Sequence, residues 1–185
     1  MKTIKSIILF ITLALALQVS ASTKGDNDFV GKMMERINAK SASYPSSEYN
    51  VVTITPAMMS SVMTMISSGA IPTDKLPKEK QEQMANLMKS VKSIRLFVTN
   101  TNVDNYQNLI NKVLSANKSI YKKYNIEDND ERAQEYRVWT RSSGKNVVEI
   151  IGIITSKDNS QKLQIVNVTG DFDDDFISLL KTFDM

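Results

Sequence analysis

The stretch Asn146-Val147-Val148-Glu149-Ile150-Ile151-Gly152-Ile153-Ile154-Thr155, residues 146–155, decides the fold. Side chains of a strand alternate between the two faces of a sheet, and both alternating sets are apolar here. One set contains Val147, Ile151 and Ile153, and the other contains Val148, Ile150 and Ile154. Such a pattern is typical of a strand covered on both faces. We therefore expect residues 146–155 to form a central strand.

Another strand is expected on each side of this central one. Residues 135–141 and 161–169 have strand composition, and turn residues separate them from the central strand at 142–145 and 157–159. Links this short join antiparallel neighbours. Two further strands are predicted earlier in the chain, at 49–55 and 91–99. The sequence thus predicts a five-stranded, largely antiparallel sheet, with a mixed sheet as the alternative.

Helices are predicted to back this sheet. Asp28 is a suitable N-cap for a first helix, whose apolar face recurs at helical spacing. Thr55-Pro56 predicts the start of a second helix that stops near Gly69. A surface loop at 70–77 leads to a third helix at 78–89. The apolar face of the first helix comprises Val30, Met33, Met34 and Ile37.

Two more helices complete the pattern. A long one begins after Asn102, and we expect its apolar face to continue to Tyr121 and Tyr124, before an acidic loop at 127–131. The last helix carries Phe176, Leu179, Leu180 and Phe183. The resulting order, α-β-α-α-β-α-β-β-β-α, predicts a single α+β domain over residues 22–185.

Residues 1–21 have the features of a signal peptide. A short segment with Lys2 and Lys5 precedes an apolar run at 7–17, and Val19-Ser20-Ala21 offers the small residues that a signal peptidase requires. The run is too short to span a bilayer. The chain contains no cysteine to carry a lipid. We expect a soluble periplasmic or secreted protein that starts at Ser22 and has no stable membrane anchor.

Composition excludes several classes of function. Lys2 and Lys5 account for two of the 23 basic residues, which leaves 21 against 20 acidic ones, so a strongly basic nucleic-acid-binding face is not expected. The chain has no histidine, the commonest general base, and no cysteine to act as a thiol nucleophile or to form a disulfide. Six glycines, scattered singly, form no phosphate-binding loop. We expect no cofactor and identify no catalytic residue.

Three segments resemble a known family. They are Ser93-Ile94-Arg95-Leu96-Phe97, Val147-Val148-Glu149-Ile150-Ile151-Gly152, and Val168-Thr169-Gly170-Asp171-Phe172-Asp173-Asp174-Asp175-Phe176. In these segments the chain is similar to small exported proteins of Bacteroidetes that contain a domain of unknown function, many of which are lipoproteins. The resemblance covers most of residues 22–185 and implies no activity. The missing cysteine argues against the lipid anchor of those relatives.

An acidic run near the C-terminus has part of a calcium-binding pattern. Asp171, Asp173 and Asp175 have the spacing that opens an EF-hand loop. The continuation fails, because Phe176 stands where glycine is required and Thr182 where glutamate is required. Asp173 is better explained as the N-cap of the last helix. We therefore predict no metal site here.

Two other patterns are better explained by structure than by chemistry. Ser142 and Lys145 match the Ser-x-x-Lys pattern of penicillin-binding enzymes, but they fall in a predicted turn rather than at a helix start. The methionines around Met59 and Met63 lie at the apolar positions of a predicted helix. Copper sites usually add histidine or cysteine, so we interpret these methionines as core residues.

Glu149 is the most informative charged residue, because it interrupts the apolar central strand. It is either a catalytic carboxylate or the partner of an arginine on a neighbouring strand, with Arg95, Arg137 and Arg141 as candidates. Trp139 is expected to be buried or to lie on the sheet surface rather than to bind a ligand.

Two functions follow. The first is a non-catalytic envelope protein that binds another protein or an apolar ligand through the sheet and the 70–77 loop. The alternative is a carboxylate-dependent hydrolase that combines Glu149 with an acid from Asp171 to Asp175. Such an enzyme requires two carboxyl groups about 5–9.5 Å apart across a cleft. Pairing of Glu149 with an arginine would argue against it. The ligand-binding residues are not identifiable from the sequence.

Overall fold

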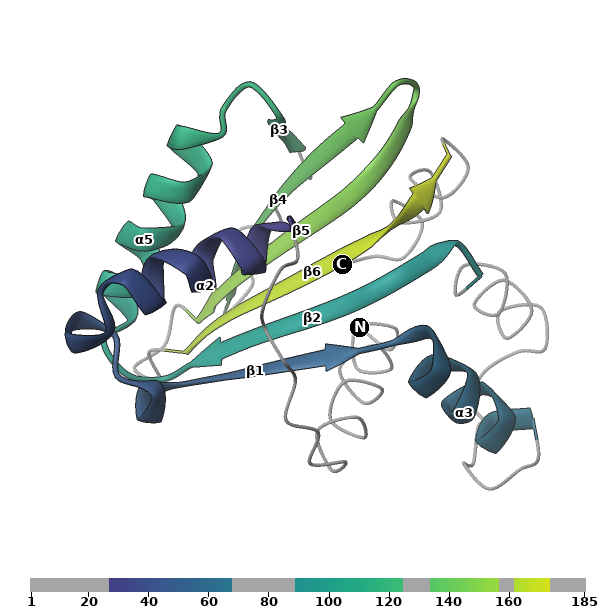
Figure 1. Cartoon of the computed structure of the whole chain (residues 1–185), viewed down its shortest axis with the longest axis horizontal. Helices are drawn as coiled ribbons and strands as arrows, with labels where there is room; N and C mark the ends of the chain where they lie inside the picture. Colours follow the sequence, from purple (N-terminus) through teal and green to yellow (C-terminus); the bar gives the residue numbers. More distant parts are fainter. Residues whose placement is uncertain (1–26, 68–88, 125–133, 157–161, 174–185) are drawn as a thin grey trace.

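A computed structural model describes residues 27–67, 89–124, 134–156 and 162–173 (Figure 1). Their strands form one six-stranded sheet in the order β1-β2-β6-β5-β4-β3, and all neighbours in it are antiparallel. The strands are β1 (Tyr49–Ile54), β2 (Val91–Thr99), β3 (Tyr121–Tyr124), β4 (Gln134–Ser143), β5 (Asn146–Ser156) and β6 (Leu163–Phe172). The helices are α2 (Phe29–Ala39), α3 (Pro56–Ser67) and α5 (Val103–Ala116). Short 3-10 turns occur at Ser41–Ser43 and Ser46–Glu48.

The α+β class and the antiparallel sheet are confirmed, but the prediction of five strands is wrong. The additional strand is β3, which contains the two tyrosines that the sequence placed on the long helix. Helix α5 ends at Ala116, because Asn117 donates its side-chain amide to the carbonyl of Val113 at 2.8 Å and its backbone N–H to that of Leu114. The chain then turns, and Tyr121 pairs with Arg141 of β4.

The predicted element order changes accordingly, with a strand between the long helix and the three-strand meander. Several predictions lie outside the described residues. These are the signal peptide at 1–21, Gly69, the loop at 70–77, most of the helix at 78–89, the acidic loop at 127–131, the turn at 157–159 and the last helix.

The central position of β5 is confirmed. It lies between β6 and β4, and Ile151 and Ile153 are fully buried on one face while Ile150 is buried on the other. The register shifts between Val147 and Glu149 against β6. Such a bulge reverses the alternation locally. Val147 therefore packs on the face of Ile150 rather than on the predicted face of Ile151.

Helices α2 and α5 cover one face of the sheet, which we call the helix face (Figure 1). The predicted apolar positions of both helices are buried there, as expected for amphipathic helices packed on a sheet. The aromatic rings of Tyr49, Phe97 and Tyr106 contact one another beneath them. The buried residues of α5 are Val103, Tyr106, Leu109, Ile110, Val113 and Leu114.

The opposite side of the sheet, which we call the second face, is mainly aliphatic and includes the buried ring of Phe172. Met58 and Met59 of α3 pack against it. The N–H of Met58 approaches the Thr55 hydroxyl at 3.4 Å, which agrees with the predicted N-cap. The partly buried aliphatic residues of this cluster are Val52, Ile94, Val138, Val147, Val166 and Val168. Among the described residues, no helix has both the length and the apolar character needed to cross a bilayer.

Candidate functional site

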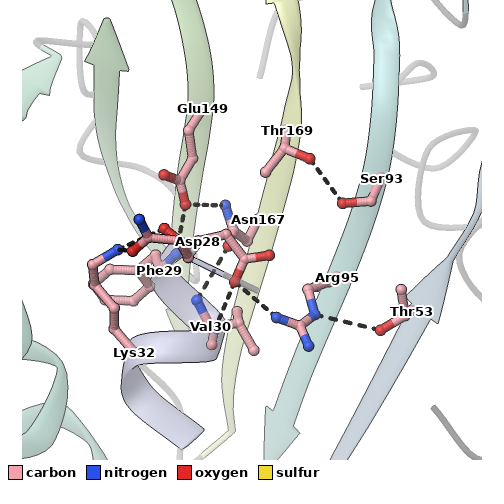
Figure 2. Close-up of polar contacts among 12 residues, drawn as sticks. Asp28, Phe29, Val30, Lys32, Thr53, Ser93, Arg95, Glu149, Asn167 and Thr169 are labelled. Carbon is pink, nitrogen blue, oxygen red and sulfur yellow. Dashed lines mark hydrogen bonds and ion pairs between the residues drawn. The ribbon is translucent and has the colours of Figure 1, made fainter. Parts of the chain in front are cut away.

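Glu149 lies at the centre of a polar cluster on the helix face. Its side chain is fully buried, and both carboxylate oxygens accept hydrogen bonds. Figure 2 shows the bonds to Phe29 and Asn167. Oε1 accepts from the backbone N–H of Phe29 at 2.6 Å and from the Asn167 amide at 2.8 Å. Oε2 accepts from Arg141 Nε at 2.6 Å and from the Tyr121 hydroxyl at 3.4 Å. The carboxylate is thus bound by donors from α2, β3, β4 and β6.

A second buried ion pair lies beside the first. Asp28 caps α2, since its Oδ1 accepts from the N–H of Gly31 at 2.7 Å, and it also accepts from Arg95 Nη1 at 2.8 Å. Only 5% of the Asp28 side chain and none of the Arg95 side chain is exposed. Arg95 Nε also approaches the Thr53 hydroxyl at 3.4 Å. The N-cap role predicted for Asp28 is confirmed, and the structure adds its arginine partner.

The cluster holds the start of α2 against the sheet. The first N–H groups of a helix have no partner within the helix. Here the N–H of Phe29 donates to Glu149, that of Val30 donates to Asn167 Oδ1 at 3.2 Å, and that of Gly31 donates to Asp28. Two acceptors come from the sheet, so the polar cluster fixes where α2 begins (Figure 2).

Burial changes the acidity of several groups in the cluster. Desolvation raises the pKa of the Asp28 carboxyl, although the Gly31 N–H and Arg95 act in the opposite direction. Burial, together with the nearby negative charge of Glu149, also raises the pKa of the Tyr121 hydroxyl. Burial lowers the pKa of Lys32, whose Nζ donates to the backbone and side-chain oxygens of Asn27 at 2.6 Å.

This arrangement is unsuited to acid–base catalysis by Glu149. A general acid or nucleophile needs access to a reacting atom, whereas all of the Glu149 side chain is buried and its oxygens are bonded to four protein donors. Of the three candidate arginines, Arg141 forms the ion pair with Glu149. The carboxylate-dependent mechanism required Glu149 to be free of such a partner.

The other two candidate arginines do not reach Glu149. Arg95 pairs with Asp28, as described above. Arg137 lies 3.6 Å from Glu135, and its guanidinium lies 5.8 Å from the Trp139 ring centre. Trp139 is partly buried against the core on the helix face, so its predicted structural role agrees with the fold.

The remaining sequence candidates are structural in the described part of the chain. Asp171, on β6, accepts from the Asn146 amide at 2.7 Å, and no group of three potential metal ligands occurs among the described residues. Asp175 lies outside them. Ser142 lies near the end of β4 and Lys145 in the exposed β4–β5 turn, where Gly144 adopts a φ of 63°. Met59 is buried in the core, as predicted.

A hollow of about 440 Å³ lies between the start of α5 and the end of β5. Asn102, Asp104, Asn105, Gln107 and Thr155 line it together with Val103 and Ser156. Sites for apolar small molecules usually have mainly apolar walls. The mainly polar walls of this hollow therefore do not fit an apolar ligand.

Sequence reasoning missed two members of the cluster. Asn167 lies on the same face of β6 as the buried Leu163 and Ile165. A polar residue among alternating apolar ones was therefore the feature of the sequence that could have indicated a buried polar contact. Tyr121 could not be paired with Glu149 while it was assigned to a helix.

Comparison with known proteins identifies the family of this chain. Residues 44–180 match the model of a domain of unknown function, DUF4252. The chain belongs to this family. The resemblance seen in the sequence is thereby confirmed at the level of the domain, and the match includes Arg95, Glu149 and Asn167 but begins after α2. No curated protein and no solved structure matched the chain.

Proposed function

We propose that this DUF4252 protein is an exported, soluble envelope protein that acts as a non-catalytic binding or accessory module. The observation that carries the proposal is the complete use of Glu149 in a buried structural cluster. The most distinctive carboxylate of the chain thus has a structural role. Export is supported by the signal-peptide pattern at residues 1–21.

The second face of the sheet is the proposed binding surface. It carries aliphatic side chains on β1, β2, β4, β5 and β6, and several of them are only partly buried. Gly152 lies near Val166 on this side, and a Cβ built at Gly152 would meet only ordinary contacts at 3.8–4.0 Å. A broad aliphatic surface favours an apolar ligand or the apolar surface of another envelope protein. Membership of the DUF4252 family does not itself imply this binding role, which is our proposal.

Recovery of bound species from the native envelope tests the proposal. The exported chain would be purified under mild conditions after chemical crosslinking, and bound proteins and apolar small molecules would be identified by mass spectrometry. We expect one species to be recovered repeatedly. Repeated recovery of the protein alone would contradict the proposal.

A matched pair of variants ties such binding to the second face. Val166→Thr with Val168→Thr makes this face more polar while keeping β-branched side chains, which suit a strand. Val51→Thr makes the same change on the helix-face side of β1, where Val51 packs against the other core cluster. We expect the double variant to lose the bound species and the control to retain it. Equal retention by both variants would place binding elsewhere.

A further inference from the structure

The two edges of the sheet differ in how well they are protected against pairing with another strand. Edge strands of monomeric proteins are usually short, charged, bulged or interrupted by proline, because unpaired backbone groups otherwise recruit another strand. β3 forms one edge and fits this rule, with four residues that include the exposed Lys122 and Lys123. The opposite edge, β1, does not.

β1 lacks each of these protective features. Its sequence Tyr49-Asn50-Val51-Val52-Thr53-Ile54 contains no charged residue and no proline. Its six residues pair continuously with β2, from Tyr49 with Thr99 to Ile54 with Ile94, without a bulge. In the described residues no strand pairs with its outer side. Asn50 is exposed, and Val51 and Val52 are only partly buried.

The uncharged surface continues from β1 into α3. Residues 49–73 contain no charged side chain, although 23% of the whole chain is charged. On the exposed side of α3, the hydroxyls of Ser61 and Thr64 donate to the carbonyls of Ala57 and Ser60 in the preceding turn, both at 3.0 Å. These hydroxyls are thus turned back onto the helix. Depletion of charge is characteristic of the central part of protein interfaces.

We propose that β1 is a homodimer interface, at which β1 strands of two copies pair antiparallel across a twofold axis and join two sheets into one. A partner strand must be neutral, free of proline and aliphatic toward the second face. β1 itself meets these requirements through Val52 and Ile54. The twofold arrangement also closes the assembly after two copies. Chain-like association of β1 with β3 is opposed by the short, lysine-bearing β3 edge.

Charge at the ends of β1 also suits a second copy. Antiparallel pairing brings the beginning of β1 in one copy beside the end of β1 in the other. Glu48 precedes β1, and α3 follows it with no acidic residue in its first turn. The start of a helix favours nearby negative charge. The Glu48 carboxylate accepts from the Asn102 amide at 2.7 Å and from the Tyr106 hydroxyl at 3.4 Å in its own chain, and in the dimer it would lie near the α3 start of the other copy.

Sedimentation of the exported chain over a concentration series tests this interface. Asn50→Lys places a lysine at the exposed position of β1, the change by which natural edge strands prevent pairing. Ser143→Lys adds the same charge at the exposed end of β4, away from β1. We expect the wild type and Ser143→Lys to form dimers, and Asn50→Lys to remain a monomer with an unchanged circular dichroism spectrum.

Single cysteines distinguish this interface from association elsewhere, since the natural chain contains none. A spin label at Asn50→Cys should show dipolar broadening between copies, and a label at Ser143→Cys should show none. A wild type that stays monomeric at all concentrations would overturn the proposal. Dimers that survive Asn50→Lys, or that broaden only the label at Ser143→Cys, would overturn it as well. A monomer that forms only a mixed complex in envelope extract would also overturn the proposal and would show that β1 pairs with a strand of another protein.

Discussion

At the scale of single residues, buried polar side chains fix the position of the first backbone N–H groups of α2. Glu149, Asn167 and Asp28 accept from three successive N–H groups at the start of α2. Arg141 and Arg95 balance the two carboxylates. Burying ions is costly, and a buried pair is tolerated when its geometry satisfies both partners. Glu149, which suggested catalysis in the sequence, therefore helps to locate a helix.

Gly170 is required by close packing. A Cβ at this position would overlap the carbonyl oxygen of Ser90 and the ring of Phe172. We expect Gly170→Ala to lower the free energy of unfolding by about 1–3 kcal/mol, as overpacking does. Gly152→Ala is the control, because its Cβ would meet only ordinary contacts. Urea unfolding of both variants measures the difference, and an equal effect at the two glycines would contradict the packing argument.

Burial of tyrosines predicts a loss of stability in alkali. Desolvation raises the pKa of Tyr106 and Tyr121 above the ordinary value of 10.0, with Glu48 and Glu149 adding to it respectively. Because the pKa of each tyrosine is higher in the folded than in the unfolded protein, keeping the hydroxyl protonated contributes to the free energy of unfolding. This contribution is complete below the unfolded pKa of 10.0 and is lost as the pH rises toward the folded pKa. Absorbance titration should show these two tyrosines ionising late. Tyr121→Phe should remove one late step, and a wild type whose six tyrosines all ionise near pH 10 would disprove the prediction.

At the scale of elements, the order of helices and strands explains which predictions succeeded. Helix α2 and the apolar face of α5 were predictable because each repeats its apolar residues at helical spacing. The central strand was predictable because it is a continuous apolar run between turn residues, which is typical of a strand covered on both faces. β3 was not, because four residues with two lysines carry too little pattern to outweigh a preceding helix. Pairing of Glu149 with Arg141 depends on register across the β4–β5 hairpin. A register shift at Arg141 and Ser142, where β5 has one residue more than β4, obscures that pairing in the sequence.

The start of α2 should be unusually resistant to hydrogen exchange. First-turn amides of a helix normally lack partners and exchange readily, whereas Phe29 and Val30 donate here to buried side chains of β5 and β6. We expect both amides to be protected in the wild type. Asn167→Leu removes the acceptor of Val30 and should accelerate exchange at these two amides. The amides of α5 serve as the internal control, and a uniform acceleration over both helices would contradict a local role for Asn167.

At the scale of the whole molecule, the sheet separates two different layers. The helix face holds the polar cluster and the aromatic core, and the second face is aliphatic. The buried cluster around Glu149 and Asp28 thus lies on one side of the described sheet, and the proposed binding surface lies on the other. The β1 edge is continuous with the second face through Val52 and Ile54.

Calcium should have no effect on the thermal stability of the molecule. Asp171 is already hydrogen-bonded to Asn146, and the acidic run departs from the EF-hand pattern at the positions of Phe176 and Thr182. Thermal melts with calcium and with chelator are expected to coincide. A melting temperature that rises with calcium in the wild type, but not in Asp173→Ala, would reveal a metal site.

The most direct test of the structural role of Glu149 is a double-mutant cycle with Arg141. Glu149→Gln should lower the free energy of unfolding by about 3–5 kcal/mol, since it leaves a charge without its buried partner. Arg141→Gln should cost at least as much, because it leaves the fully buried Glu149 carboxylate without its cation, whereas the Arg141 that remains in Glu149→Gln is 28% exposed. We expect the double variant to lose less stability than the two single variants together, by about 0.5–3 kcal/mol. Additive losses, or a Glu149→Gln variant within about 0.5 kcal/mol of the wild type, would show that Glu149 is not held in place for stability.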